Sequence, residues 1–114
     1  PPIYKVVDLT AQNATIGATN LYAAAPTGLY RFNASLLTNA LNTAALTAAL
    51  RIDWTDGGGA QSSTFSSLNM QALGNVSAMS MLESVSPNNI QYRVTLTGTV
   101  DTGTYELHIA LEKL

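Results

Sequence analysis

Apolar and polar residues alternate one by one along several segments of this chain, and that period of two constrains the fold more than any other feature. The clearest segment is the last, where every second residue is apolar: Tyr105, Leu107, Ile109 and Leu111. The segment over 90–96 repeats the pattern. Such alternation is typical of a strand with one buried and one exposed face. We therefore predict two strands, joined as an antiparallel hairpin through the turn residues at 101–103.

Further segments give the same signal upstream. Alternation over 30–36 follows the turn residues at 26–28, and alternation over 46–54 ends at an aspartate and three glycines. Four weaker strands are expected over 3–9, 20–24, 62–68 and 76–85, each bounded by Gly, Pro or Asn. Alanine and leucine are strong helix formers, so a helix over 39–50 is the alternative to a strand that begins there.

About eight short strands in 114 residues, with no long helical pattern between them, predict an all-β protein. We expect a single domain over 1–114 that forms a two-sheet antiparallel sandwich of jelly-roll type. An immunoglobulin-like sandwich is the alternative topology. If an initiator methionine is removed ahead of Pro1, we expect these residues to be a complete small protein.

Charge is scarce in this sequence. Charged residues make up 11% of the chain, against about 25% in ordinary soluble domains. Because the cores of protein interfaces are depleted in charge, we expect part of the surface to face protein, and a merely neutral polar surface is the alternative. The net charge of −2, without a basic cluster, argues against a nucleic-acid partner. No apolar run approaches the roughly 18 residues of a membrane span, so no membrane association is expected.

The sequence offers little material for an active site. It has no cysteine and one histidine, His108, so any metal site or Ser-His-Asp arrangement would depend on that single ring. Carboxylates that could pair for glycoside hydrolysis exist, but their spacing singles out none of them. We therefore predict no enzyme activity, no catalytic residue, no metal and no cofactor.

The last predicted strand carries a candidate interface. His108 alternates with the inward residues and shares its face with Glu106 and Glu112, which lie two and four positions away. If this face contacts another subunit, protonation of His108 at mildly acidic pH would alter assembly.

A second candidate contact site surrounds the glycine turn. Trp54 ends a predicted strand beside Asp56, Gly57 and Gly58, where an aromatic ring can stack on a glycan or contact a partner. A core position is the default interpretation of Trp54, as of the other aromatic residues, and the contact site is the alternative to it. Asp53 and Asp56 superficially resemble a calcium loop, but their spacing does not match an EF-hand. A turn in which Asp56 accepts a bond from its own following backbone explains them without metal.

Four stretches of the chain carry a family resemblance: Ala14-Thr15-Ile16-Gly17-Ala18-Thr19-Asn20-Leu21-Tyr22, Gly28-Leu29-Tyr30-Arg31-Phe32 after Pro26, Asp53-Trp54-Thr55-Asp56-Gly57-Gly58, and Thr104-Tyr105-Glu106-Leu107-His108-Ile109. Together they resemble small β-sandwich structural proteins of tailed bacteriophages, of the capsid decoration or cement type. The resemblance implies a homotrimer that binds the major capsid protein on the capsid surface of a virion, after assembly in the host cytoplasm. It implies no catalytic residue.

Three functions follow from these observations as alternatives. The preferred one is a virion structural protein that decorates and cements a capsid by protein–protein contact. The second is a carbohydrate- or receptor-binding module of a phage tail or head fibre, with Trp54 and the loops at 57–59 and 87–89 as its site. The third, a glycan-cleaving enzyme, rests only on the presence of carboxylates.

Overall fold

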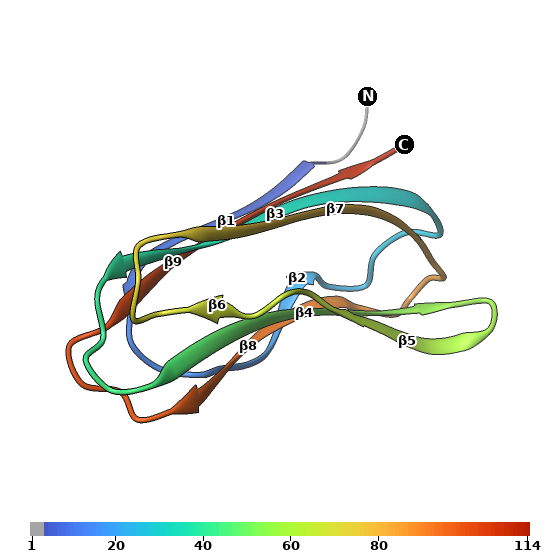
Figure 1. Ribbon diagram of the computed structural model, residues 1–114. Helices are drawn as coiled ribbons and strands as arrows, with labels where there is room; N and C mark the ends of the chain where they lie inside the picture. The colour runs from blue at the N-terminus through green and yellow to red at the C-terminus, as the bar shows by residue number, and fades with distance from the viewer. Residues whose placement is uncertain (1–3) are drawn as a thin grey trace.

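The computed structural model describes residues 4–114, which fold into two antiparallel sheets packed face to face (Figure 1). This part of the chain forms nine strands: β1 (Tyr4–Gln12), β2 (Ile16–Tyr22), β3 (Gly28–Ala40), β4 (Leu46–Asp56), β5 (Gly59–Thr64), β6 (Leu68–Asn69), β7 (Asn75–Ser84), β8 (Ile90–Gly98) and β9 (Thr104–Lys113). The predicted all-β sandwich is confirmed, and the topology is consistent with a jelly roll. Residue 3, where the first strand was predicted to begin, lies outside the described residues.

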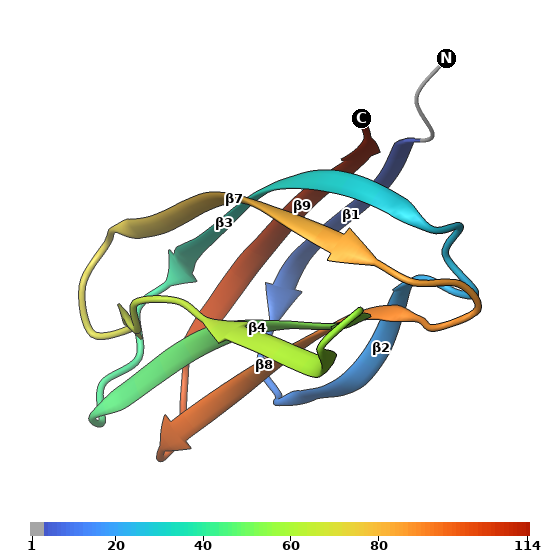
Figure 2. The ribbon, with the colours of Figure 1, turned by 90° about the vertical axis from the view of Figure 1, so that its right-hand side faces the viewer.

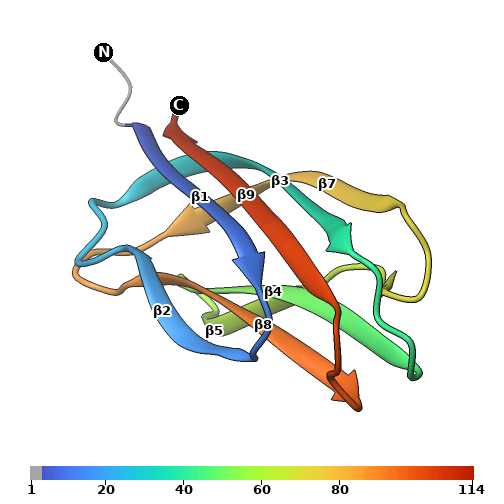
Figure 3. The same cartoon turned by 90° about the vertical axis from the view of Figure 1, so that its left-hand side faces the viewer.

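Strands that follow one another in the sequence are distributed between the two sheets. Sheet A has the order β1-β9-β3-β7, and sheet B has the order β2-β8-β4-β5, with β6 also paired to β4. Figure 3 shows β1 and β9 of sheet A lying over β2 and β8 of sheet B. No helix long and apolar enough to cross a membrane occurs within residues 4–114.

The predicted hairpin between 90–96 and 105–111 is wrong. β8 pairs with β2 and β4, whereas β9 pairs with β1 and β3, so the connection at 99–103 crosses from one sheet to the other. Alternation reports which face of a strand is buried, but it carries no information about the neighbour in the sheet. Both strands bury their apolar faces, and they do so from opposite sides of one core.

The alternative helix over 39–50 is also wrong. β3 continues to Ala40, and β4 begins at Leu46 after a short loop. Leu46, Ala48, Leu50 and Ile52 are all buried on one face of β4, which a helical path could not achieve with this spacing. Tertiary burial therefore overrides the helix propensity of alanine and leucine.

Two of the weaker strand predictions need correction. The segment 62–68 is not one strand, because β5 ends at Thr64 and β6 begins at Leu68. Between them, Phe65 turns toward the core, its N–H donates to the Leu50 carbonyl at 3.0 Å, and its ring lies 5.5 Å from that of Phe32. The strand predicted over 20–24 is displaced, since β2 runs from Ile16 to Tyr22.

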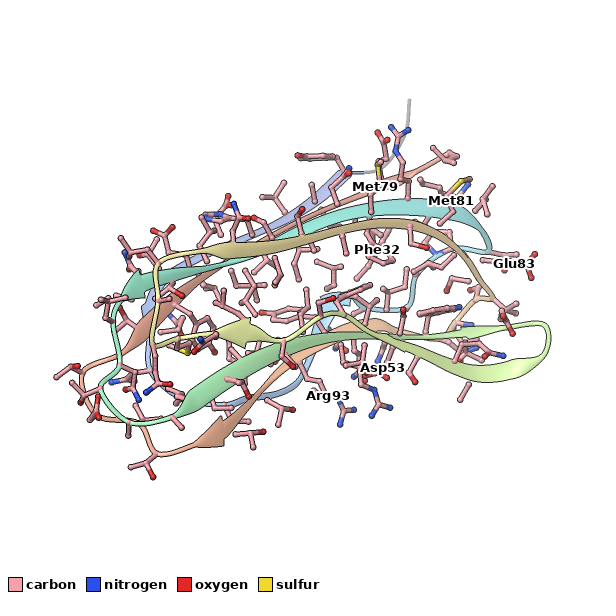
Figure 4. All side chains as sticks on the ribbon, viewed as in Figure 1. Phe32, Asp53, Met79, Met81, Glu83 and Arg93 are labelled. Carbon is pink, nitrogen blue, oxygen red and sulfur yellow. The ribbon has the colours of Figure 1, made fainter. Side chains whose placement is uncertain are left out.

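The core lies between the sheets, and most of it consists of the residues that the alternation marks as inward. Core residues that the alternation did not mark are Leu21, Ala25, Leu68, Met70 and Leu82. Phe32 points into this space in Figure 4, and Tyr30 and Tyr105 are fully buried beside the aliphatic side chains. The Tyr105 hydroxyl donates to the Ala14 carbonyl at 2.7 Å, and burial raises the pKa of Tyr105 to about 12. Full burial of each large apolar side chain contributes roughly 1.5–3 kcal/mol, so this layer dominates the stability of the fold.

Asn42 ties together the two loops at one end of the sandwich. Its side chain is buried, and Nδ2 donates to the carbonyls of Ala44 and Thr99, each at 2.8 Å. Its Oδ1 accepts from the backbone N–H groups of Asp101 and Gly103, at 2.8 and 3.0 Å. One amide therefore uses both donors and both lone pairs to join the β3–β4 loop to the β8–β9 connection.

Ser84 at the end of β7 provides a test of polar burial in this core. Its hydroxyl is fully buried and has no hydrogen-bond partner among the described residues. Because an unsatisfied buried hydroxyl is destabilising, Ser84→Ala should leave the free energy of unfolding unchanged or raise it by about 1 kcal/mol. Urea denaturation measures this change. A loss above about 1 kcal/mol would instead show that the hydroxyl is satisfied, for example by a bound water.

Candidate interaction surfaces

The outer face of sheet A carries exposed apolar side chains on both of its margins. Tyr4 and Val6 on β1 are 62% and 47% exposed, and Met79 and Met81 on β7 are 68% and 52% exposed. Figure 4 shows the two methionines pointing away from the core. Exposed apolar residues gathered on one face mark interaction sites more often than singly scattered ones do.

A shallow depression of about 350 Å³ lies between these margins, on the β1 side. Ala110 lies at its centre, since it pairs in register with Val6 on β1 and with Asn33 on β3. Tyr4 also lines the depression, and His108 lies at its other end. A small residue flanked by larger ones leaves a hollow into which a partner side chain can insert.

The predicted interface residues lie on this face, but they do not form one cluster. His108 Nδ1 is 2.7 Å from Asp8 Oδ1 on β1, and His108 Nε2 is 3.7 Å from Glu106 Oε2. Glu112 instead forms an ion pair with Arg31 on β3. The position of Asp8 beside His108 was missed, because the pairing of β1 with β9 brings together residues 100 positions apart.

The Asp8 contact sets the protonation of His108. The hydrogen bond to the Asp8 carboxylate raises the pKa of His108 above its ordinary value of 6.5, against the opposing effect of partial burial, and Glu106 adds to the rise. Since the folded-state pKa is the higher one, the pair stabilises the fold fully below about pH 6.5. That contribution is lost as the pH rises through the folded-state pKa.

NMR titration of the His108 ring protons tests this assignment. The pKa should lie above 6.5 in the parent protein, and Asp8→Asn should lower it because the variant removes the charged acceptor. Glu112→Gln is the matched control on the same strand, and it should leave the His108 pKa nearly unchanged because Glu112 pairs with Arg31. Equal pKa values in the parent and Asp8→Asn proteins would contradict the Asp8 contact.

The outer face of sheet B is polar and carries a three-residue ion cluster. Arg51 and Arg93 lie directly opposite each other on β4 and β8, a like-charge pairing that is unfavourable by itself. Asp53 lies between them, with its two carboxylate oxygens 2.7 Å from Arg51 Nε and 3.1 Å from Arg93 Nε. Figure 4 shows Asp53 and Arg93 on the side of sheet B away from Phe32.

The predicted glycine turn joins β4 to β5. Asp56 Oδ1 accepts from the backbone N–H of Gly58 at 2.8 Å and from Gln61 Nε2 at 3.2 Å. The expected turn, in which Asp56 bonds its own following backbone, is thereby confirmed. Gly59 has a φ of 111°, which a residue with a side chain rarely adopts.

Trp54 is half-buried and packs against the core, yet it also borders a surface depression. That depression has a volume of about 310 Å³ and brings Trp54 together with Gln61, Asn89 and Arg93. The structure thus places Trp54 near the end of the predicted 87–89 loop. Gly57 and Gly58 are exposed in the turn and are not among the lining residues.

Metal ligands are not gathered in the described part of the chain. Within residues 4–114, no group of three or more His, Asp or Glu side chains is placed to hold a metal ion.

This chain is similar to known proteins in its structure and not detectably in its sequence. No protein-family model matches the sequence, and no curated protein matches it. The VP2 subviral particle of infectious bursal disease virus aligns over 98% of this chain and 33% of that chain, with a TM-score of 0.57 and 10% identity. The capsid structure of Helicobacter pylori bacteriophage KHP30 aligns over 99% of this chain and 87% of that chain, with a TM-score of 0.55 and 11% identity. The chain shares its fold with proteins of two virus particles.

At identities near 10%, these alignments establish the shared fold alone. This chain spans about a third of the length of the VP2 chain. A CBM22-1–GH10 xylanase 10B of Clostridium thermocellum aligns over 97% of this chain and 26% of that chain, with 12% identity and a TM-score of 0.48, too loose a likeness to bear on function.

Proposed function

We propose that this protein is a virion structural protein of the capsid decoration or cement type. The observation that carries the proposal is the overlap with the KHP30 capsid chain, because it extends over 99% of this chain and 87% of that one. The exposed apolar side chains on the two margins of sheet A support the same function. The proposal includes no catalytic step.

The protein would act by contact on the capsid surface, after assembly in the host cytoplasm. It oligomerises, as the homotrimer that the phage resemblance implies, and binds across subunits of the major capsid protein. A ligand that binds only the assembled shell stabilises that shell by mass action. A stable contact of this kind buries about 800 Å² on each partner, and the outer face of sheet A is the surface that we assign to it.

The experiment adds the purified chain to capsids that lack it and measures both co-sedimentation and the temperature at which the capsids come apart. We expect saturable binding and a higher disruption temperature. Val6→Asp places a charge in the apolar margin of sheet A and should weaken binding at least tenfold. The matched control is Thr95→Asp, on the exposed outer face of sheet B, and it should bind as the parent does. A parent protein that does not bind capsids would overturn the proposal.

The second candidate, a carbohydrate- or receptor-binding module, is favoured by one observation, the depression that joins Trp54 to Gln61 and Asn89. An indole ring bordered by amide groups is typical of glycan sites. A glycan array tests it with the parent, Gln61→Ala and Trp54→Phe proteins. Binding that both variants lose would favour this candidate, and an array without binding would eliminate the glycan form of it.

A further inference from the structure

The four sheet edges of this sandwich are not protected alike. Sheet A ends at β1 and β7, and sheet B ends at β2 and β5. An open edge presents unpaired N–H and C=O groups to any other strand. Monomeric proteins protect such edges with charges, prolines, bulges or very short strands.

Three of these edges carry such protection. β1 has Lys5 near its start and a register shift between Leu9 and Gln12, with Ala11 at a φ of 53°. β2 has two register shifts within its seven residues. β5 has six residues against ten in β7, and the edge that it forms beside β4 is interrupted between Thr64 and Leu68, where the two-residue β6 begins.

The edge of β7 has only one of these devices, a single charge near its end. All ten of its residues pair with β3 in one unbroken register, from Leu37 opposite Asn75 to Gly28 opposite Ser84. The strand contains no proline, and Glu83 is its one charged residue. Figure 2 shows β7 running along the open side of sheet A, and no strand within residues 4–114 pairs with its outer edge.

β7 is also held firmly at both ends. The carbonyl of Gly74, just before the strand, accepts from the N–H of Thr38 at 3.0 Å. The N–H of Val85, just after it, donates to the carbonyl of Thr55 on β4 at 2.9 Å. The edge is therefore long and held at both ends, so little conformational entropy is lost when another strand pairs with it.

We propose that β7 pairs in antiparallel fashion with β7 of a second copy of the chain, across a two-fold axis, and so joins two sheets A into one eight-stranded sheet. This contact goes beyond the capsid role proposed above, and it does not depend on it. Strand addition of this kind obtains its affinity from main-chain hydrogen bonds.

The sequence of β7 is complementary to itself, which identifies a second copy as the occupant. With the two-fold axis at Ser80, Met79 of each copy lies opposite Met81 of the other, and the exposed methionines form one apolar cluster. In the same register Glu83 lies opposite Ser77 of the second copy, so no like charges face each other. A two-fold contact that uses one surface twice is the commonest form of self-association.

The two-fold contact is separate from the three-fold contact of the proposed trimer. If only β7 pairs, the particle in solution is a dimer, and if a trimer also forms with its three-fold axis perpendicular to the two-fold axis, the particle is a hexamer. In either case the mass is an even multiple of the chain mass, and loss of the β7 contact halves it.

Light scattering over a concentration series measures that mass. The parent protein should give an even multiple, and the double variant Met79→Lys with Met81→Lys should give half of it, because four lysines then gather at the contact. Both methionines are more than half exposed, so the fold tolerates the change. The control, Thr95→Lys with Thr97→Lys on sheet B, should keep the parent mass. A monomeric parent, or a mass that the double variant leaves unchanged, would overturn the proposal.

Cross-linking gives a second measurement that does not require the lysine variants. Because the chain has no cysteine, single replacements from Ser77→Cys to Met81→Cys introduce the only thiols. Residues opposite each other in an antiparallel pair have Cα atoms about 4.5–5.5 Å apart, within the range of a disulfide. The position on the two-fold axis, Ser80→Cys in the register above, should therefore oxidise to a dimer much faster than Thr10→Cys on β1, the other edge of the same sheet. Equal rates at the two edges would contradict the β7 pairing.

Discussion

Replacing Asn42 with alanine should lower the free energy of unfolding by about 3 kcal/mol. The Asn42 side chain is buried, and it makes hydrogen bonds to four backbone groups of the β3–β4 loop and the β8–β9 connection. Alanine leaves two N–H groups and two carbonyls without that partner. The cost of each unsatisfied group is about 1–3 kcal/mol, and entry of water at the loop end recovers part of the total.

Urea denaturation followed by tryptophan fluorescence measures this loss, and an unchanged m-value shows that the two states keep their compactness. Asn13→Ala is the matched control, since it removes the same side chain from an exposed loop and should change stability by less than about 0.5 kcal/mol. A loss below about 1 kcal/mol for Asn42→Ala would mean that water replaces the amide without penalty.

This contact also explains why the hairpin prediction failed. In the sequence, 101–103 has the composition of a tight turn, and the strands on either side alternate cleanly. In the fold, Asp101 and Gly103 donate to Asn42, 59 and 61 positions away, and the chain crosses between the sheets. Strand identity and the buried face follow from local pattern, whereas the neighbour of a strand depends on contacts between distant residues.

In the candidate surfaces too, the local sequence pattern predicts some features, whereas others depend on contacts between distant residues. The outward position of Glu106, His108 and Glu112 follows from alternation on one strand, and it holds in the structure. Their ionic partners do not follow, because Asp8 and Arg31 come from strands that only the sheet register brings alongside. The Asp56 turn was predictable because its hydrogen bond spans two residues.

The low charge content has a structural consequence for both outer faces. Arg31 pairs with Glu112, and Asp53 pairs with two arginines, so several of the few charged groups are neutralised within the chain. Ion pairs at exposed sites contribute little to stability. Their effect here is to reduce the net charge of both outer faces, while Asp8, Glu83 and Glu106 leave an excess of negative charge on the outer face of sheet A.

Gly98→Ala should be at least as damaging as the loss of Asn42, with a cost of about 3 kcal/mol or more. Gly98 ends β8 at a φ of 121°, a backbone conformation that residues with a side chain rarely adopt. A Cβ atom added there would lie 2.1 Å from the carbonyl oxygen of Ala45. That carbonyl accepts the N–H of Thr99 at 3.2 Å, so the strand end has to open to relieve the clash.

Thermal unfolding tests this cost, and a drop in Tm of about 10 °C or more is expected for a domain of this size. Gly17→Ala on β2 is the matched control, because nothing lies within 4 Å of its added Cβ atom. Its Tm should stay within a few degrees or rise slightly, since alanine restricts the unfolded chain. If the Tm of Gly98→Ala equals that of the control, β8 can move away from the Ala45 carbonyl at little cost. If the Tm is far lower, the close approach of the two strands at this end fixes both the end of β8 and the crossing to β9.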